Sequence, residues 1–214
     1  MDRRPTPPSP PHRLESRSFL ASVIVLFALA GCTGTPDGVQ AVEDFELDRY
    51  LGTWYEIARL DHPFERGLTE VTAEYRPREG GGIEVVNSGF DPEEGERRSA
   101  VGKAFFVGDP SIGMLKVSFF GPFYGGYNVI ALDTRNYCWS MVAGPNRSYL
   151  WILGRTPDLD PTIVARLESE ARGLGFPVDE LIRVEHARRE EKPNDSGHCA
   201  PGQRTPGRRN IVLD

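Results

Sequence analysis

The sequence predicts an all-β protein, an eight-stranded up-and-down antiparallel barrel with one C-terminal helix packed outside it. Three observations predict this fold. The 214 residues include 23 glycines and 18 prolines, so turns are frequent and long helices are not expected. Short apolar or alternating runs, separated by turn sequences, follow one another from residue 53 to residue 154. One later stretch, residues 161–173, has the spacing of a helix with one apolar face.

The N-terminus has the pattern of a secretory signal. Four arginines precede the apolar run Phe19–Ala30, whose twelve residues are too few to span a bilayer, which takes about 20. The run ends in Leu29-Ala30-Gly31-Cys32, and small residues directly before a cysteine resemble a bacterial lipobox. The resemblance implies that residues 1–31 are removed and that Cys32 is acylated. The alternative is an ordinary signal in which Cys32 is incidental.

The mature chain is expected to be one acidic, membrane-anchored domain on a short tether. Removing the signal takes away four arginines together with Asp2 and Glu15, which shifts the formal net charge from −6 to −8. Binding to nucleic acid depends on basic side chains, so this balance argues against such a partner. Residues 32–44 are polar and turn-rich and predict the tether. Two or more acyl chains on Cys32 would anchor the mature protein stably in a membrane. Residue 33 is Thr and not the Asp that signals inner-membrane retention, which favours the outer membrane, with the domain facing the periplasm.

Eight strands are expected in order, each bounded by turn residues. Their ranges are Thr53–Arg59, Leu68–Tyr75, Gly82–Phe90, Arg98–Val107, Gly113–Phe120, Tyr124–Leu132, Tyr137–Ala143 and Tyr149–Gly154. Such a meander closes most economically into a barrel, because closure removes the edges of the sheet.

One helix follows the strands. Asp160 can cap it, Pro161 suits its first turn, and apolar residues recur at helical spacing up to Leu174, before Gly175 ends it. Residues 181–184 then predict a short edge strand, and residues 187–214 a polar tail expected to be disordered.

Two cysteines remain in addition to Cys32. Cys138 and Cys199 are an even number in an oxidising compartment, so a disulfide between them is plausible. Two free thiols fit the sequence equally well, because a single bridge has no spacing pattern to read.

Three separated segments carry a family resemblance. They are Gly52-Thr53-Trp54-Tyr55-Glu56, Ala131-Leu132-Asp133 and Trp151-Ile152-Leu153-Gly154-Arg155. In this order they resemble the three sequence signatures of the lipocalin family, and the chain is most similar to the bacterial outer-membrane lipocalins. The match covers residues 45–186, the expected barrel and helix. The resemblance implies that Trp54 and Arg155 pack together as a structural pair at the closed end of the barrel, and Arg155 can lie over the indole.

The other end of the barrel should be open, with a pocket lined by alternate residues of the strands. The resemblance places Asn87 and Trp151 inside, and Glu56 and Ala58 have the parity of Trp54. The aromatic segment between the fifth and sixth strands adds Phe119 and Tyr127, although wall packing is the alternative for such aromatics. Glu56 has no evident titratable partner. No cofactor is expected, nor a metal site, because the three remaining histidines lack ligand spacing.

These features predict a lipid-anchored periplasmic lipocalin that binds, stores or transports fatty acids or lysophospholipids for envelope maintenance. One alternative is an enzyme acting on a hydrophobic substrate inside the barrel, which would need a convergent titratable pair. Another is a structural envelope lipoprotein with a filled barrel. A homodimer is also compatible with the resemblance, since lipocalins sometimes pair.

Overall fold

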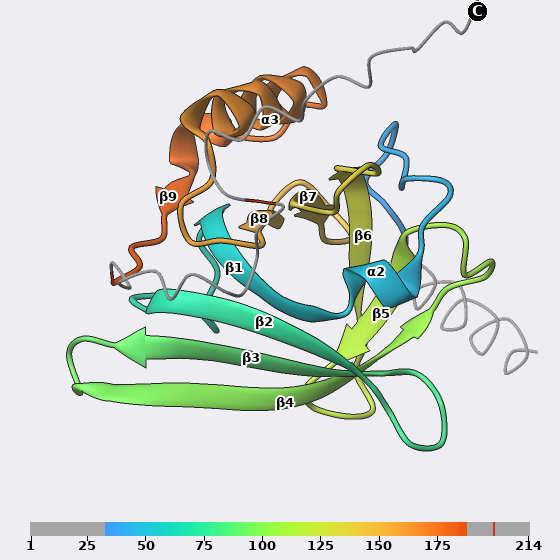
Figure 1. The fold of residues 1–214 in the computed structure, drawn as a ribbon, viewed down its shortest axis with the longest axis horizontal. Coiled ribbons are helices and arrows are strands. Elements are labelled where there is room, and N and C mark those ends of the chain that lie inside the picture. The colour runs from blue at the N-terminus through green and yellow to red at the C-terminus, as the bar shows by residue number, and fades with distance from the viewer. Residues whose placement is uncertain (1–32, 188–198, 200–214) are drawn as a thin grey trace, which may run out of the picture. The chain divides into compact units, whose positions relative to one another are not determined.

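The computed structural model of the chain describes residues 33–187 and Cys199, and in them eight antiparallel strands close into a barrel (Figure 1). The sheet order is β2-β3-β4-β5-β6-β7-β8-β1, with β2 pairing β1 to close it and β9 added beside β1. The strands are β1 (Gly52–Arg59), β2 (Thr69–Pro77), β3 (Ile83–Asp91), β4 (Glu96–Phe106), β5 (Met114–Ser118), β6 (Gly125–Leu132), β7 (Trp139–Ala143), β8 (Leu150–Gly154) and β9 (Ile182–Arg183). The predicted all-β barrel is confirmed.

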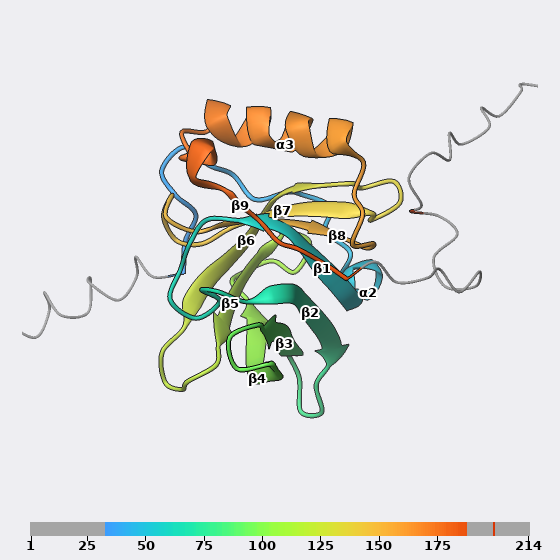
Figure 2. The ribbon, with the colours of Figure 1, turned by 90° about the vertical axis from the view of Figure 1, so that its left-hand side faces the viewer.

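The up-and-down order puts alternate connections at opposite ends of the barrel. The loops that follow β1, β3, β5 and β7 surround one end, called the mouth below. The loops that follow β2, β4 and β6 lie at the other end, the floor, together with the short helix α2 (Leu47–Tyr50). In Figure 2, α2 lies on the right of the barrel, and the described chain begins on the left. The four residues of α2 have no side-chain cap, which is why no sequence signal marked them.

Helix α3 (Pro161–Gly173) has the predicted bounds and lies outside the barrel (Figure 2). Asp160 caps it, since its Oδ1 accepts a hydrogen bond from the Thr162 amide at 2.8 Å. Its buried residues are Val164, Leu167 and Ala171, and the last two belong to an apolar cluster on the outer wall. The 3-10 helix η2 (Val178–Glu180) follows, and β9 is shorter than the predicted edge strand.

Two apolar clusters lie on opposite sides of the barrel wall. The outer cluster, beneath α3, includes Ala58, Met141, Ile152, Leu167 and Phe176. The inner cluster fills the floor and includes Tyr50, Trp54, Tyr75, Leu115 and Leu153. Alternate residues of one strand serve the two clusters, as the period of two in a strand requires.

Residues 33–44, for which the sequence suggested a tether, run along the barrel wall. The Asn128 amide nitrogen donates to the carbonyl of Gly34 at 2.9 Å. Val42 joins the backbone of Gly113 and Val129 through hydrogen bonds of 2.9 and 2.8 Å. Val39 is buried in the outer cluster. The segment is therefore held to the domain from its second described residue onward.

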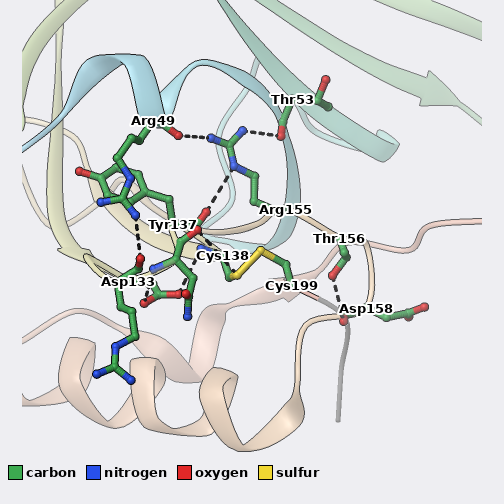
Figure 3. The surroundings of a disulfide bond; sticks show 11 residues. Arg49, Thr53, Asp133, Tyr137, Cys138, Arg155, Thr156, Asp158 and Cys199 are labelled. Carbon is green, nitrogen blue, oxygen red and sulfur yellow. Dashed lines mark hydrogen bonds between the residues drawn. A yellow bond between two sulfur atoms is a disulfide. The ribbon is translucent and has the colours of Figure 1, made fainter. Parts of the chain in front are cut away.

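Cys138 and Cys199 are joined by a disulfide with a Cα–Cα distance of 5.3 Å (Figure 3). The bridge fastens Cys199 beside the start of β7. Residues 1–31, Cys32 and most of the tail predicted over 187–214 lie outside the described residues.

No helix among the described residues is long and apolar enough to cross a membrane.

Candidate ligand-binding site

The floor of the barrel is closed by Trp54 and Arg155. Trp54 is completely buried, and its Nε1 donates to the Tyr50 carbonyl at 2.8 Å. The Arg155 guanidinium lies 3.9 Å from the centre of the Trp54 ring. It donates to the carbonyls of Thr53 and Arg49 at 2.9 and 2.7 Å (Figure 3). This cation–π contact, together with the hydrogen bonds of Arg155, closes the floor.

Three tyrosine hydroxyls meet above the floor. Tyr127 lies 2.7 Å from both the Tyr50 and the Tyr75 hydroxyl, and Tyr50 also contacts the Ser140 hydroxyl at 3.2 Å. Burial raises the pKa of Tyr50 to about 12 and the pKa values of Tyr75 and Tyr127 well above their ordinary value. The hydroxyls therefore stay neutral. Only a small apolar cavity remains beside them, so the lower barrel is filled.

A buried polar cluster, Glu56, Arg59, His62 and Glu65, lies between the floor and the mouth. Each of its members is at most 6% exposed. Arg59 donates to the Glu56 carboxyl group at 3.1 Å and to the Glu65 main-chain carbonyl at 2.6 Å. His62 Nε2 lies 2.9 Å from Glu65 Oε2. Glu65 comes from the β1–β2 loop at the mouth, so this loop folds back into the barrel.

Glu65 connects the cluster to the inner wall. Trp151 Nε1 donates to Glu65 Oε2 at 3.2 Å, and Asn87 Nδ2 donates to Glu65 Oε1 at 3.4 Å. The predicted pocket residues Glu56, Asn87 and Trp151 thus meet around a residue that the sequence did not single out. Asn87 Oδ1 is buried and has no hydrogen-bond partner among the described residues.

The two carboxyl groups of the cluster have opposite pKa shifts. Burial raises the pKa of Glu56 well above its ordinary value, and the charge of Glu65 raises it further, although Arg59 opposes both. Burial also acts to raise the pKa of Glu65. The hydrogen bond to His62, the charge of His62 and the hydrogen bond from Trp151 outweigh burial and hold that pKa below its ordinary value. Glu56 is therefore the protonated partner and Glu65 the ionised one.

These shifts make the cluster sensitive to pH in two directions. The contribution of Glu56 to stability is present below its ordinary pKa and is lost as the pH rises through its raised pKa. The contribution of Glu65 is present above its ordinary pKa and is lost as the pH falls through its lowered pKa. No titratable partner was expected for Glu56, but both Arg59 and Glu65 lie against it.

The prediction that Ala58 lines the pocket is wrong. A bulge in β1 shifts the register, so that Glu56 pairs with Leu153, Ala58 with Ile152 and Arg59 with Trp151. Ala58 therefore faces the outer cluster beneath α3, and Arg59 faces inward. One extra residue in a strand reverses the faces of all the residues that follow it, and parity counted from Trp54 could not show it.

Toward the mouth several inward-facing side chains are only partly buried. Ala73, Val117, Phe119, Tyr127 and Trp151 pack against the inner cluster yet keep part of their surface exposed. The Phe119 ring lies against Gly102, where an added Cβ would come within 2.8 Å of it. A second hollow, on the outer face of β1–β4 near His186, is lined mostly by polar side chains and does not suit an acyl chain.

Comparison with known proteins identifies the fold and the family. A family model described as a lipocalin-like domain matches residues 45–186. Outer membrane lipoprotein Blc of Vibrio cholerae serotype O1 is 54% identical over 157 residues, which are 73% of this chain and 92% of that protein. The chain belongs to the lipocalin family.

Other relatives agree with this lipocalin assignment. Outer membrane lipoprotein Blc of Escherichia coli K12 is 49% identical over 169 residues, covering 78% of this chain and 95% of that protein. Insecticyanin of the tobacco hornworm Manduca sexta shares the fold with a TM-score of 0.58 at 22% identity, over 72% of this chain and 88% of that one. This lipocalin is an outer-membrane lipoprotein with a lipid-binding role, as the sequence predicted.

Proposed function

We propose that this lipocalin binds one single-chain lipid, a fatty acid or a lysophospholipid, with the acyl chain inside the upper barrel and the head group at the mouth. The observation that carries the proposal is the partial exposure of inward-facing Ala73, Val117, Phe119 and Trp151 inside a closed wall. An eight-stranded barrel is just wide enough to hold one small ligand. Because the tyrosines fill the lower barrel, the tail stops above them.

The buried polar cluster supports a head group held outside the barrel. Arg59 already donates to the Glu56 carboxyl group and to the Glu65 main-chain carbonyl, and the Glu65 carboxylate is ionised. A lipid carboxylate or phosphate beside them would meet like charge in a buried setting, which is costly. The free Asn87 Oδ1 can accept a hydrogen bond from a neutral hydroxyl, which favours a lysolipid with its glycerol near this residue.

The membrane anchor is part of the same proposal. Acylation of Cys32 would hold the protein in the outer membrane, facing the periplasm, where single-chain lipids arise from phospholipids. Binding them would remove detergent-like molecules from the envelope, which is the maintenance role the sequence suggested.

Affinity is expected to rise steeply with chain length and then level off. Each buried CH₂ contributes about 0.8 kcal/mol, or about fourfold in Kd, until the tail reaches the tyrosines. The measurement is a titration with saturated fatty acids, followed by Trp151 fluorescence in a Trp139→Phe background. Trp151→Ala should weaken binding and leave the fold intact. A Kd that does not change with chain length would contradict a lipid pocket and favour a filled, structural barrel.

A hydrolase is the second candidate, and a specific observation favours it. Glu56 and Glu65 are a neutral and an ionised carboxyl side by side, the combination that acid–base chemistry uses. Among the described residues, no group of three or more His, Cys, Asp or Glu could hold a metal ion. Recovery of a bound lysophospholipid unchanged after prolonged incubation supports binding. Its cleavage by the native protein, with loss of cleavage in Glu65→Gln, would support the hydrolase.

A further inference from the structure

The described chain begins at the mouth of the barrel. A Cβ added to Gly126 would lie 3.1 Å from the Gly34 carbonyl oxygen and 3.2 Å from the carbonyl carbon of Thr33. Gly126 is the second residue of β6, directly after the β5–β6 loop of the mouth. The Asn128 side chain holds Gly34 in this place. The residue that follows Cys32 is therefore fixed at the rim.

The segment after Gly34 is also held against the domain, so no flexible linker separates residue 33 from the barrel. Arg147, in the β7–β8 loop of the mouth, donates to the Asp37 carbonyl at 2.6 Å, and Pro36 is buried. Adjacent Cα atoms are about 3.8 Å apart, so Cys32 cannot lie far from Thr33. Acyl chains on Cys32 would enter the bilayer beside the mouth, and not at the end of a long tether.

The rim next to this point carries two exposed aromatic side chains, with a tyrosine and two lysines, all half-buried, beside them. Phe120 and Phe123 in the β5–β6 loop are each 79% exposed. Tyr124 follows them, with the Lys116 and Lys103 ammonium groups 5.3 and 6.0 Å from the centre of its ring. We call these five residues the mouth patch. Aromatic rings with lysines beside them suit the boundary between lipid head groups and acyl chains.

The β3–β4 hairpin, which neighbours the β5–β6 side of the mouth in the sheet order, has a net negative charge. Four acidic residues, Asp91, Glu93, Glu94 and Glu96, outnumber Arg97 and Arg98 at its tip, where Arg98 pairs with Asp91 at 2.8 Å. An anionic lipid surface attracts the mouth patch and repels this hairpin tip. The charges therefore favour contact on the β5–β6 side, which is also the side of Thr33.

We propose that the mouth patch docks on the lipid surface in which Cys32 is anchored, so that the barrel opens onto the leaflet from which it takes its ligand. The proposal rests on the anchor described under the proposed function. We infer a lipid surface as the partner because the anchor, the exposed aromatic rings and the lysines lie on one part of the rim. The fixed N-terminal segment then acts as a strut that keeps the mouth at the membrane.

The test measures contact between the patch and lipid acyl chains. The full-length lipoprotein is placed in vesicles of phosphatidylethanolamine with a minor share of phosphatidylglycerol, some of it brominated in the acyl chains. Tryptophan is introduced as Phe123→Trp in the mouth patch or, as a matched control, as Glu79→Trp in the β2–β3 turn at the floor. Interfacial side chains reach about 5–10 Å into the head-group and acyl boundary, so brominated lipid should quench the tryptophan at position 123 and spare the one at position 79.

Two results would overturn the docking proposal. A water-exposed emission spectrum for Phe123→Trp would show that nothing covers the loop. A blue-shifted spectrum without quenching by bromine would show that protein, such as a second copy of the chain, covers it. Cys32→Ser separates the docking proposal from the anchor. If this variant still sediments with vesicles after a high-salt wash, Cys32 is not the membrane anchor and the strut has no function. If Cys32→Ser is released but Phe123→Trp is not quenched, the anchor stands and the docking proposal alone is overturned.

Discussion

Trp54→Ala is expected to lower the free energy of unfolding by about 3–5 kcal/mol, the range for truncation of a buried aromatic residue. Trp54 is completely buried, stacks near Tyr50 with 4.7 Å between ring centres and donates to the Tyr50 carbonyl. Alanine would leave a cavity at the floor, remove the ring beneath Arg155 and orphan that carbonyl. Urea titration of the purified protein, with its disulfide intact, measures the loss.

Trp54→Phe is the matched control for this change. It keeps most of the ring volume and the contact with Arg155 but loses the indole donor, so its cost should be clearly smaller than that of alanine. A loss below about 1 kcal/mol for Trp54→Ala would mean that the floor does not depend on this residue. The barrel-closing role of the Trp54 and Arg155 pair would then be wrong.

Arg59→Met is expected to cost about 1–3 kcal/mol, because it leaves the buried Glu65 main-chain carbonyl and the buried Glu56 carboxyl group without their hydrogen-bond donor. Arg59 is 1% exposed, and its guanidinium contacts both the Glu56 carboxyl group and the Glu65 main-chain carbonyl. The ionised Glu65 carboxylate would keep His62 as its main counterpart. The measurement is again denaturant unfolding, at a neutral pH where Glu65 is charged.

The β1–β2 loop offers a matched control for Arg59. Arg66 pairs with Asp61 at 2.7 Å, but both side chains are largely exposed, so Arg66→Met should cost no more than about 1 kcal/mol. The double variant Arg59→Met with Glu56→Gln removes both side chains of the contact, and its loss should be smaller than the sum of the two single losses. Equal small effects for Arg59 and Arg66 would show that the cluster is solvated and does not lie inside the barrel.

Much of the fold could be predicted because its signals are local. Turn residues and alternating apolar runs marked all eight strands, and Asp160, Pro161 and the apolar spacing marked α3 at its observed bounds. Trp54 and Arg155 could be paired because the family signatures carry both. Such features depend on neighbours in the sequence or on a motif, and not on the register of distant strands.

The features that were missed depend on contacts between distant residues. The inward turn of Arg59 follows from a bulge that only the pairing of β1 with β8 reveals. Glu65 lies in a charged loop of the kind that is usually solvated, and no local pattern shows that the loop folds back inside. The N-terminal segment is polar, and it is fixed by partners such as Asn128, 94 residues away from Gly34.

The central claim is that the upper barrel holds a lipid. The most direct test is to identify and quantify the lipid that remains bound to the protein after purification from its own membrane. Lipid released by denaturation of the purified lipoprotein is quantified by mass spectrometry in the native protein and two variants. Ala73→Phe fills an inward-facing, half-buried position, whereas Ala165→Phe adds the same ring on the exposed face of α3. The account predicts about one single-chain lipid per protein in the native form and in Ala165→Phe, and a large loss in Ala73→Phe. Native protein without lipid, or equal lipid in Ala73→Phe, would contradict it.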